Sequence, residues 1–257
     1  MQMPRTVCIL NFAFCIAICH AGSAYAQAPE NFIVEAGVMF WKPSPEIVIT
    51  SGSLGTPVDF VTGFSVEDKR LSDYRFVLKA GKHKLRFSTL PITYEGTQVL
   101  TQTIRFNGQN YAVGVPTTAE LKWTLMRFGY EWDALVTERG FVGLIFDLKY
   151  NKMNAQLSAP LVTQTYERNV PVPTIGGIWR GYLTPTASIT AEFTGLKFNR
   201  NNVNAKFYDF DIYGTGNFGR HAGAQFGYRS VTVDYTADAD AGNMKLKGPY
   251  LGALVRF

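Results

Sequence analysis

The strongest constraint in this sequence is an alternation of apolar and polar residues with a period of two, which recurs along almost the whole chain. Residues 139–151 show it clearly, since Val142, Leu144, Phe146, Leu148 and Tyr150 would share one face, opposite Gly143, Asp147, Lys149 and Asn151. Successive side chains of a β-strand point to opposite faces, so this pattern predicts strands with one apolar and one polar face. Helical periodicity is not sustained anywhere. The sequence therefore predicts an all-β chain.

Segments with this alternation number about ten, and clusters of Gly, Pro, Asn and Asp separate them. They lie near residues 31–41, 70–80, 83–95, 119–132, 139–152, 173–183, 187–199, 204–218, 222–235 and 245–257. Tight joins such as Ala80-Gly81-Lys82 alternate with longer ones at 42–69, 96–118, 153–172 and 236–244. Short turns on one side, long loops on the other and an even strand count are typical of outer-membrane barrels.

We therefore expect an antiparallel transmembrane β-barrel of about ten strands, with eight or twelve strands as the next alternatives. A soluble β-sandwich or a lipocalin-like barrel is the other explanation of the alternation. Strands in such proteins usually have about five or six residues, whereas a tilted strand needs about 9–11 residues to cross a bilayer. The lengths of the segments favour the membrane barrel.

The N-terminal residues 1–26 are typical of a secretory signal peptide. Arg5 supplies the positive start, the apolar run 7–19 follows, and Ala24-Tyr25-Ala26 fits the small-x-small cleavage rule. A membrane anchor is the alternative, but the run is shorter than the ~20 residues needed to span hydrocarbon. We expect residues 1–26 to be removed and residues 27–257 to form one barrel domain. All three cysteines, Cys8, Cys15 and Cys19, would leave with the signal, which excludes disulfides and thiolate metal sites in the mature chain.

The last strand ends in a recognisable pattern, because Leu251, Ala253, Val255 and Phe257 alternate to one face and the chain stops on an aromatic residue. The positions of Tyr250, Gly252, Val255 and Phe257 match those of an aromatic, a glycine, a hydrophobic and a terminal aromatic residue. This pattern resembles the C-terminal strand of bacterial outer-membrane β-barrel proteins, and most of the mature chain resembles uncharacterised small barrels of this kind in general style. The resemblance implies that the barrel-assembly machinery recognises the last strand.

The polar faces of the predicted strands carry charges of both signs, nine cations against six anions. The lumen charge network that we expect comprises Glu35, Arg86, Arg127, Glu131, Asp147, Lys149, Arg180, Glu192, Asp209, Asp211, Arg229 and Arg256, and Arg75, Lys79 and Lys84 share these faces. An unpaired buried charge costs several kcal/mol, so facing charges should pair and fill a narrow lumen. The alternative is a pathway for a small anion, favoured by the surplus of cations at Arg86, Arg127, Arg180 and Arg229.

Aromatic girdles are expected at both edges of the hydrocarbon. Tyr130, Trp132, Phe141, Tyr182, Phe218 and Phe257 would serve the turn side, and Phe40, Trp41, Tyr94, Trp123, Tyr150 and Phe198 the loop side.

Candidate catalytic and metal-binding residues are few. Of the three histidines, His20 lies in the signal, and His83 and His221 lie in tight turns expected on the periplasmic side. Asp209 and Asp211 form the one carboxylate pair on a shared strand face, suited to acid–base work, to Ca²⁺ or simply to pairing with Arg229. Metal motifs and Gly-rich phosphate loops are not found in the sequence. We expect no catalytic, cofactor-binding or metal-binding residues, no cofactor and no enzymatic activity.

The function that these observations favour is a non-enzymatic integral protein of the Gram-negative outer membrane, a scaffold for surface loops that serve binding, adhesion or envelope stability. A narrow, porin-like channel or a carrier for a small anionic or amphiphilic solute is the alternative. Loop 42–69 and a hairpin tip at Asn107-Gly108 are the surface candidates, unless they pack over the barrel opening.

Expected partners are outer-membrane lipid and the assembly machinery, with the surface ligand unknown. The net charge of +5 is spread without a basic block, so nucleic acid is not expected.

Overall fold

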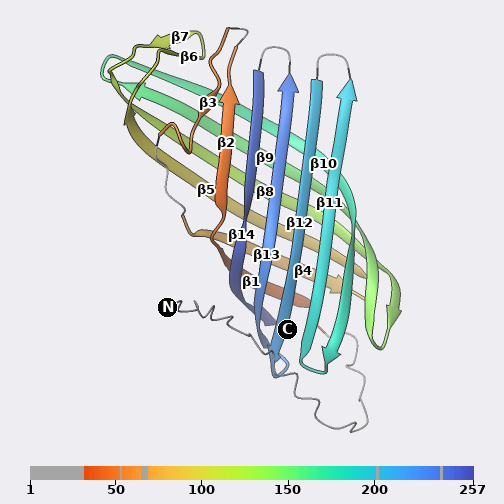
Figure 1. Cartoon of the computed structure of the whole chain (residues 1–257). Helices are drawn as coiled ribbons and strands as arrows, with labels where there is room; N and C mark the ends of the chain where they lie inside the picture. Colours follow the sequence, from red (N-terminus) through yellow and green to blue (C-terminus); the bar gives the residue numbers. More distant parts are fainter. Residues whose placement is uncertain (1–31, 53, 65–68, 201–202, 238–239) are drawn as a thin grey trace, which may run out of the picture.

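A computed structural model describes residues 32–52, 54–64, 69–200, 203–237 and 240–257 (Figure 1). The expected signal peptide lies outside these residues. The elements are β1 (Val34–Trp41), β2 (Ser44–Thr50), β3 (Val58–Asp59), β4 (Leu71–Ala80), β5 (His83–Val99), β6 (Ile104–Phe106), β7 (Gln109–Tyr111), β8 (Pro116–Thr137), β9 (Gly140–Ala159), β10 (Val162–Thr184), β11 (Ala187–Arg200), β12 (Val203–Phe218), β13 (Ala222–Ala237) and β14 (Asp240–Arg256). The described residues contain no helix long and apolar enough to cross a membrane.

Ten of these strands form a closed antiparallel ring in the order β1-β4-β5-β8-β9-β10-β11-β12-β13-β14, and β14 pairs back onto β1. This confirms the predicted all-β barrel of about ten strands. The joins β4–β5, β8–β9, β10–β11 and β12–β13 lie at one end, at the bottom of Figure 1, together with the C-terminus. There the amide of Arg256 donates to the carbonyl of His221, and the amide of Val34 donates to the carbonyl of Phe257. We call this end the turn side and the other end the loop side.

On the edge away from β13, β14 pairs with β1 and β2, which together act as one long strand with a break at Lys42-Pro43. β14 pairs with β1 through Tyr250–Arg256 and with β2 through residues 241–247. Gly248 faces the break, and a Cβ there would clash with the carbonyl oxygen of Lys42, so the close backbone approach requires glycine. Beyond the break the strand leaves β4 and continues beside β14, with the short β3 on its other edge.

In long strands such as β8 and β9, the outer face is apolar on the turn-side half and polar on the loop-side half, and the inner face changes in the opposite sense. In β8, Phe128 and Tyr130 point outward on the turn-side half, opposite the buried Glu131. Farther toward the loop side, Lys122 points outward and the buried Trp123 points inward. β9 does the same, with Val142, Leu144, Phe146, Leu148 and Tyr150 outward on the turn-side half and Met153, Ala155 and Leu157 inward on the loop-side half.

The outward apolar residues of the turn-side half form a surface that we call the apolar belt. It includes those within residues 34–40, 74–78, 85–89, 126–132, 142–150, 175–183, 189–195, 208–218, 222–228 and 249–257. In β9 the belt extends from Val142 to Tyr150, about the span that a tilted strand needs to cross a bilayer. The belt is therefore the part of the barrel suited to contact with hydrocarbon.

The loop-side half extends beyond the belt and has an apolar core of its own. Trp41, Leu90 and Ile92 of the barrel wall are almost completely buried in it, as are Phe60 and Phe64 from the segment between β3 and β4. This core lies inside the barrel, where the turn-side half carries charged residues. The two halves of the lumen are thus filled by different chemistry.

Several predicted loops are part of this extension. Residues 153–172, predicted as a long join, continue β9 and β10 around a turn at residues 160–161, and residues 236–244 include the ends of β13 and β14. The described part of residues 42–69 is not a free loop either, because β2 joins the wall and Val58 is buried. The predicted joins at residues 153–172 and 236–244 are therefore wrong over most of their length, because the strands continue past the belt.

The predicted hairpin tip at Asn107-Gly108 is confirmed, with positive φ at both residues. The flanking Phe106 and Tyr111 are buried. The hairpin of β6 and β7 therefore packs over the barrel opening rather than projecting from it.

Of the residues predicted for the aromatic girdles, only some lie on the outer face of the belt. The exposed members are Tyr130, Trp132, Phe218, Phe257 and Phe40, with Tyr150 half-buried. The remaining members point inward: Phe141 and Tyr182 belong to a small inner cluster, Trp41, Tyr94 and Trp123 to the loop-side core, and Phe198 has the inward parity of β11. The exchange of faces explains most of these errors, because an aromatic residue beyond the belt packs inward.

Candidate functional site

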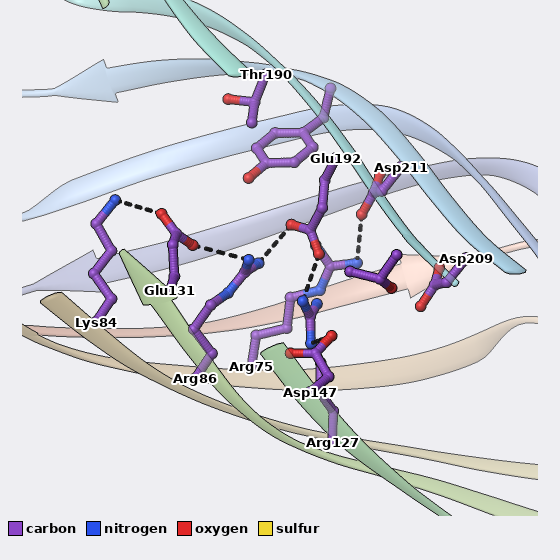
Figure 2. Close-up of polar contacts among 12 residues, drawn as sticks. Arg75, Lys84, Arg86, Arg127, Glu131, Asp147, Thr190, Glu192, Asp209 and Asp211 are labelled. Atoms are coloured by element: carbon purple, nitrogen blue, oxygen red, sulfur yellow. Dashed lines mark hydrogen bonds and ion pairs between the residues drawn. The ribbon is translucent and has the colours of Figure 1, made fainter. Parts of the chain in front are cut away.

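The lumen at the level of the belt holds an unbroken series of ion pairs, which we call the lumen chain; Figure 2 shows part of it. Seven carboxylates alternate with six cations in the order Asp133, Lys84, Glu131, Arg86, Glu192, Arg127, Asp147, Lys149, Asp209, Arg229, Asp73, Arg75 and Asp211. These residues come from β4, β5, β8, β9, β11, β12 and β13. The lumen chain therefore ties strands on opposite sides of the ring to one another.

The links at the centre of the lumen chain are short. Glu192 on β11 contacts Arg86 at 2.6 Å and Arg127 at 2.6 Å, so one carboxylate connects β11 to β5 and β8. Asp209 on β12 contacts Lys149 at 2.6 Å and Arg229 at 2.9 Å. Because these groups are largely buried, each charge depends on its neighbours to replace water.

Two further arginines lie beside the lumen chain on the turn side. Arg256 on β14 contacts Glu35 on β1 at 2.6 Å, and this pair bridges the strands that close the ring. Arg180 on β10 donates to the hydroxyls of Thr190 and Tyr213 and lies over the ring of Phe141.

All twelve residues of the expected lumen charge network lie on the inner face. Nine of them belong to the lumen chain, Glu35 and Arg256 form the pair that closes the ring, and Arg180 is the twelfth. The structure thus brings together nearly all of the charges that the alternation placed on the polar faces.

Two carboxylates of the lumen chain were not among the residues expected from the sequence. Asp73 bridges Arg75 at 2.8 Å and Arg229 at 2.9 Å, and Asp133 contacts Lys84 at 3.1 Å. Asp73 has the same parity as Arg75 in β4, so the alternation could have identified it. Asp133 lies where the sequence predicts a join, yet β8 continues to Thr137. With these two acids the surplus of cations inferred from the sequence is smaller, and the argument for an anion pathway weakens.

A small cavity lies in the lumen at this level. A cavity of about 40 Å³ remains among residues that include Asp73, Arg75, Glu192 and Asp211. A volume of this size holds a few water molecules. The ion pairs therefore surround little free space at this cavity.

The loop-side half contains packing of a different kind. The hairpin β6–β7 buries Ile104, Phe106 and Tyr111 in the apolar core, and the Tyr111 hydroxyl donates to the carbonyl of Leu157 at 2.9 Å. The amide of Thr56 donates to the carbonyl of Arg105, which joins residues 54–64 to the hairpin. These segments pack where β2 and the loop-side part of β5 are not paired with each other.

A polar cluster lies outside the belt, between the loop-side ends of β10 and β14. Arg168 donates to the hydroxyl of Tyr166 at 2.9 Å and to the carboxylate of Asp240, which also accepts from the Gly52 amide at 2.9 Å. Burial acts to raise the pKa of Asp240, but the hydrogen bonds from Gly52 and Arg168 outweigh it and hold the pKa below its ordinary value. Burial raises the pKa of the neighbouring Tyr235, which therefore stays protonated.

His83 and His221 lie on the turn side, as predicted. The Nδ1 atom of His83 is 2.6 Å from the hydroxyl of Tyr130, and the Nδ1 atom of His221 is 2.9 Å from the carbonyl oxygen of Arg256. In the described part of the chain, no group of three or more His, Cys, Asp and Glu side chains is arranged to hold a metal ion.

Comparison with known proteins identifies the fold. No family model matches the chain, and no curated protein matches it. Among solved structures, the outer-membrane protease OmpT from Escherichia coli has a TM-score of 0.56 at 7% identity, over 87% of this chain and 96% of OmpT. The toluene transporter TodX from P. putida has a TM-score of 0.34 at 11% identity, over 90% of this chain and 91% of TodX. The monoaromatic hydrocarbon channel CymD has a TM-score of 0.35 at 8% identity, over 90% of each chain.

The likeness to OmpT shows that the chain has the fold of an outer-membrane β-barrel. It also corrects one expectation. We expected no enzymatic activity because the histidines lie on the turn side, but a barrel of this architecture is a protease. The architecture therefore does not argue against catalysis, and the exclusion of an enzyme from the sequence alone was wrong.

Proposed function

We propose that the chain is an integral protein of the Gram-negative outer membrane whose filled barrel is a scaffold for a binding region on its loop side. The observation that supports this most is the filling of the lumen. Ion pairs occupy it at the level of the belt, where a cavity of about 40 Å³ lies among them, and an apolar core occupies much of the loop-side half. A barrel filled in this way is suited to holding structure outside the membrane rather than to conducting solutes.

The binding region in this proposal is the extension of the barrel beyond the belt. β8, β9 and β10 have 22, 20 and 23 residues. These strands are about twice as long as a tilted strand needs to be to cross a bilayer. Their outer faces there carry exposed charges such as Lys122 and Lys152. Such a wall is suited to water on the outside of the cell, where adhesion or ligand binding takes place.

The proposal includes insertion by the barrel-assembly machinery, with outer-membrane lipid around the belt. Of the four residues of the expected assembly signal, Val255 and Phe257 are exposed on the outer face, while Tyr250 and Gly252 are buried on the inner face. The strict alternation of this strand and its outward terminal aromatic residue support this part of the proposal.

Conductance of the protein in a planar lipid bilayer tests the closed scaffold against the channel alternative. We expect no steady current, because the lumen chain fills the barrel, and an open porin in the same bilayer is the positive control. Arg180→Ala changes a cation in the lumen, and Lys122→Ala is the matched change on the outer wall. An anion-selective current that falls for Arg180→Ala and persists for Lys122→Ala would contradict the proposal and support the channel.

A further inference from the structure

A cavity of about 170 Å³ lies on the inner side of the loop-side half. The buried Trp123, Met153 and Phe207 line it, together with Leu196 and Val233. It is separate from the space among the ion pairs, with which it shares no lining residue. The surface of this cavity is almost entirely apolar.

Apolar residues also lie exposed along its rim. Val170 on β10 is 45% exposed and Val203 on β12 is 39% exposed, and both have the inward parity of their strands. They lie beyond the belt, so the hydrocarbon of the membrane does not cover them. Apolar surface that faces water inside a concave site is typical of a place where a ligand binds.

Of the charged residues that line the cavity, Arg168 has an ion-pair partner, whereas Lys206 and Asp234 have the outward parity of their strands. Arg168 donates to the carboxylate of Asp240. Lys206 lies opposite Asp234 in the register of β12 and β13. A charged ligand would therefore compete with existing partners and would lose its own hydration. An uncharged ligand would gain the apolar contact without that cost.

We propose that this cavity binds a small uncharged molecule with an apolar body of about six to eight carbon atoms. The size follows from comparison with an engineered apolar cavity of about 150 Å³ in another protein, which holds benzene. The inference rests on the proposed function, since it names a ligand class for the loop-side region. A hydroxyl group on such a molecule would lie at the rim, beside Arg168.

The test uses 4-fluorobenzyl alcohol as the probe and ¹⁹F NMR of the full mature protein in detergent. We expect saturable binding to the wild type. Ala205→Trp puts an indole into the cavity and should weaken binding at least tenfold. Asn204→Trp is the matched control, because it adds the same side chain one residue away on the outer face of β12, and it should bind like the wild type. The anion 4-fluorobenzoate should bind at least tenfold more weakly than the alcohol.

A second variant keeps the outcome decisive if Ala205→Trp fails to fold. Leu196→Ala enlarges the cavity and should improve binding of the larger 6-fluoro-2-naphthol relative to the alcohol. A heat-dependent shift in gel mobility shows whether each variant is folded. Equal signals from all folded variants, or a probe that never saturates, would mean partition into detergent only and would overturn the inference. A conducting barrel that still binds the alcohol in this way would overturn the proposed function alone.

Discussion

At the scale of single residues, the five carboxylates inside the lumen chain each contact two cations, whereas Asp133 and Asp211 end it. Asp209, for example, contacts Lys149 and Arg229. Loss of a carboxylate that bridges two cations leaves both cations with one ion-pair partner fewer. The stability of the barrel should therefore be more sensitive to these acids than to ion pairs at the surface.

Replacement of Asp209 by Asn should lower the free energy of unfolding by about 3–5 kcal/mol, because it leaves buried cations with incomplete compensation. The matched control is Glu46→Gln, which breaks exposed contacts with Lys245 and Lys247 and should cost about 0–1 kcal/mol. Urea unfolding in lipid vesicles, followed by tryptophan fluorescence, gives both values. Equal losses in the two variants would count against the lumen chain as a stabilising element.

The cluster at Asp240 should make the loop side sensitive to acid. The pKa of Asp240 is lowered in the folded protein, so its contribution to stability is present above the ordinary value of 3.8 and is lost as the pH falls through the lowered pKa. Hydrogen exchange at residues 159–168, corrected for its intrinsic pH dependence, should therefore speed up below a pH of about 4. In Asp240→Asn the exchange should be faster at neutral pH and should lack this step. An identical pH profile in both proteins would contradict the prediction.

The alternation placed the predicted lumen residues on the inner face because parity alone decides which way a strand residue points. It could not reveal which charges meet, since Glu192 and Arg86 are on strands that are not neighbours in the ring. Contacts across a lumen depend on the tilt and stagger of the whole barrel. The loop-side cavity was missed for the same reason, because its walls come from several separate strands.

At the scale of elements, the hairpin β6–β7 has an exposed tip but is held to the barrel by buried side chains beside that tip. Phe106 is 0% exposed. Phe106→Ala should destabilise the hairpin by about 3–5 kcal/mol, because it leaves a cavity in the apolar core. We expect protease cleavage within residues 100–115 of this variant while the belt stays intact. Val113→Ala, a change at a residue that is 57% exposed, is the control and should stay resistant. Resistance of both variants would show that the hairpin does not depend on this contact.

The positions of all ten ring strands were predictable to within a few residues on the turn side, because the apolar belt imposes a clear alternation there. Their loop-side ends were not. Beyond the belt the alternation continues, but the polar residues now lie on the outer face and the apolar residues on the inner face, as Lys122 and Trp123 show. In β10, the Asn and Pro residues of this part also make the sequence resemble a loop. A pattern of period two reports that the faces differ, but it does not report which face meets water.

At the scale of the whole molecule, the proposed function makes the belt the part that sets how deeply the barrel sits in the membrane. Phe146→Arg places a charge on the outer face in the middle of the belt and should cost about 2–4 kcal/mol of stability in vesicles. Gln156→Arg makes the same kind of change on the same face of β9 but beyond the belt, and it should cost about 0–1 kcal/mol. Unfolding of both variants from the same vesicles measures the difference. Similar costs would show that the belt has been assigned to the wrong residues.

The exchange of faces also limits how the strands can change in length during evolution. Removing one residue from β9 between Leu148 and Met153 would turn every later side chain to the opposite face, with Lys152 inside and Met153 outside. Removing two residues together would keep both faces and only shorten the wall. Insertions and deletions within such strands should therefore come in pairs, whereas single-residue changes should be confined to the turns.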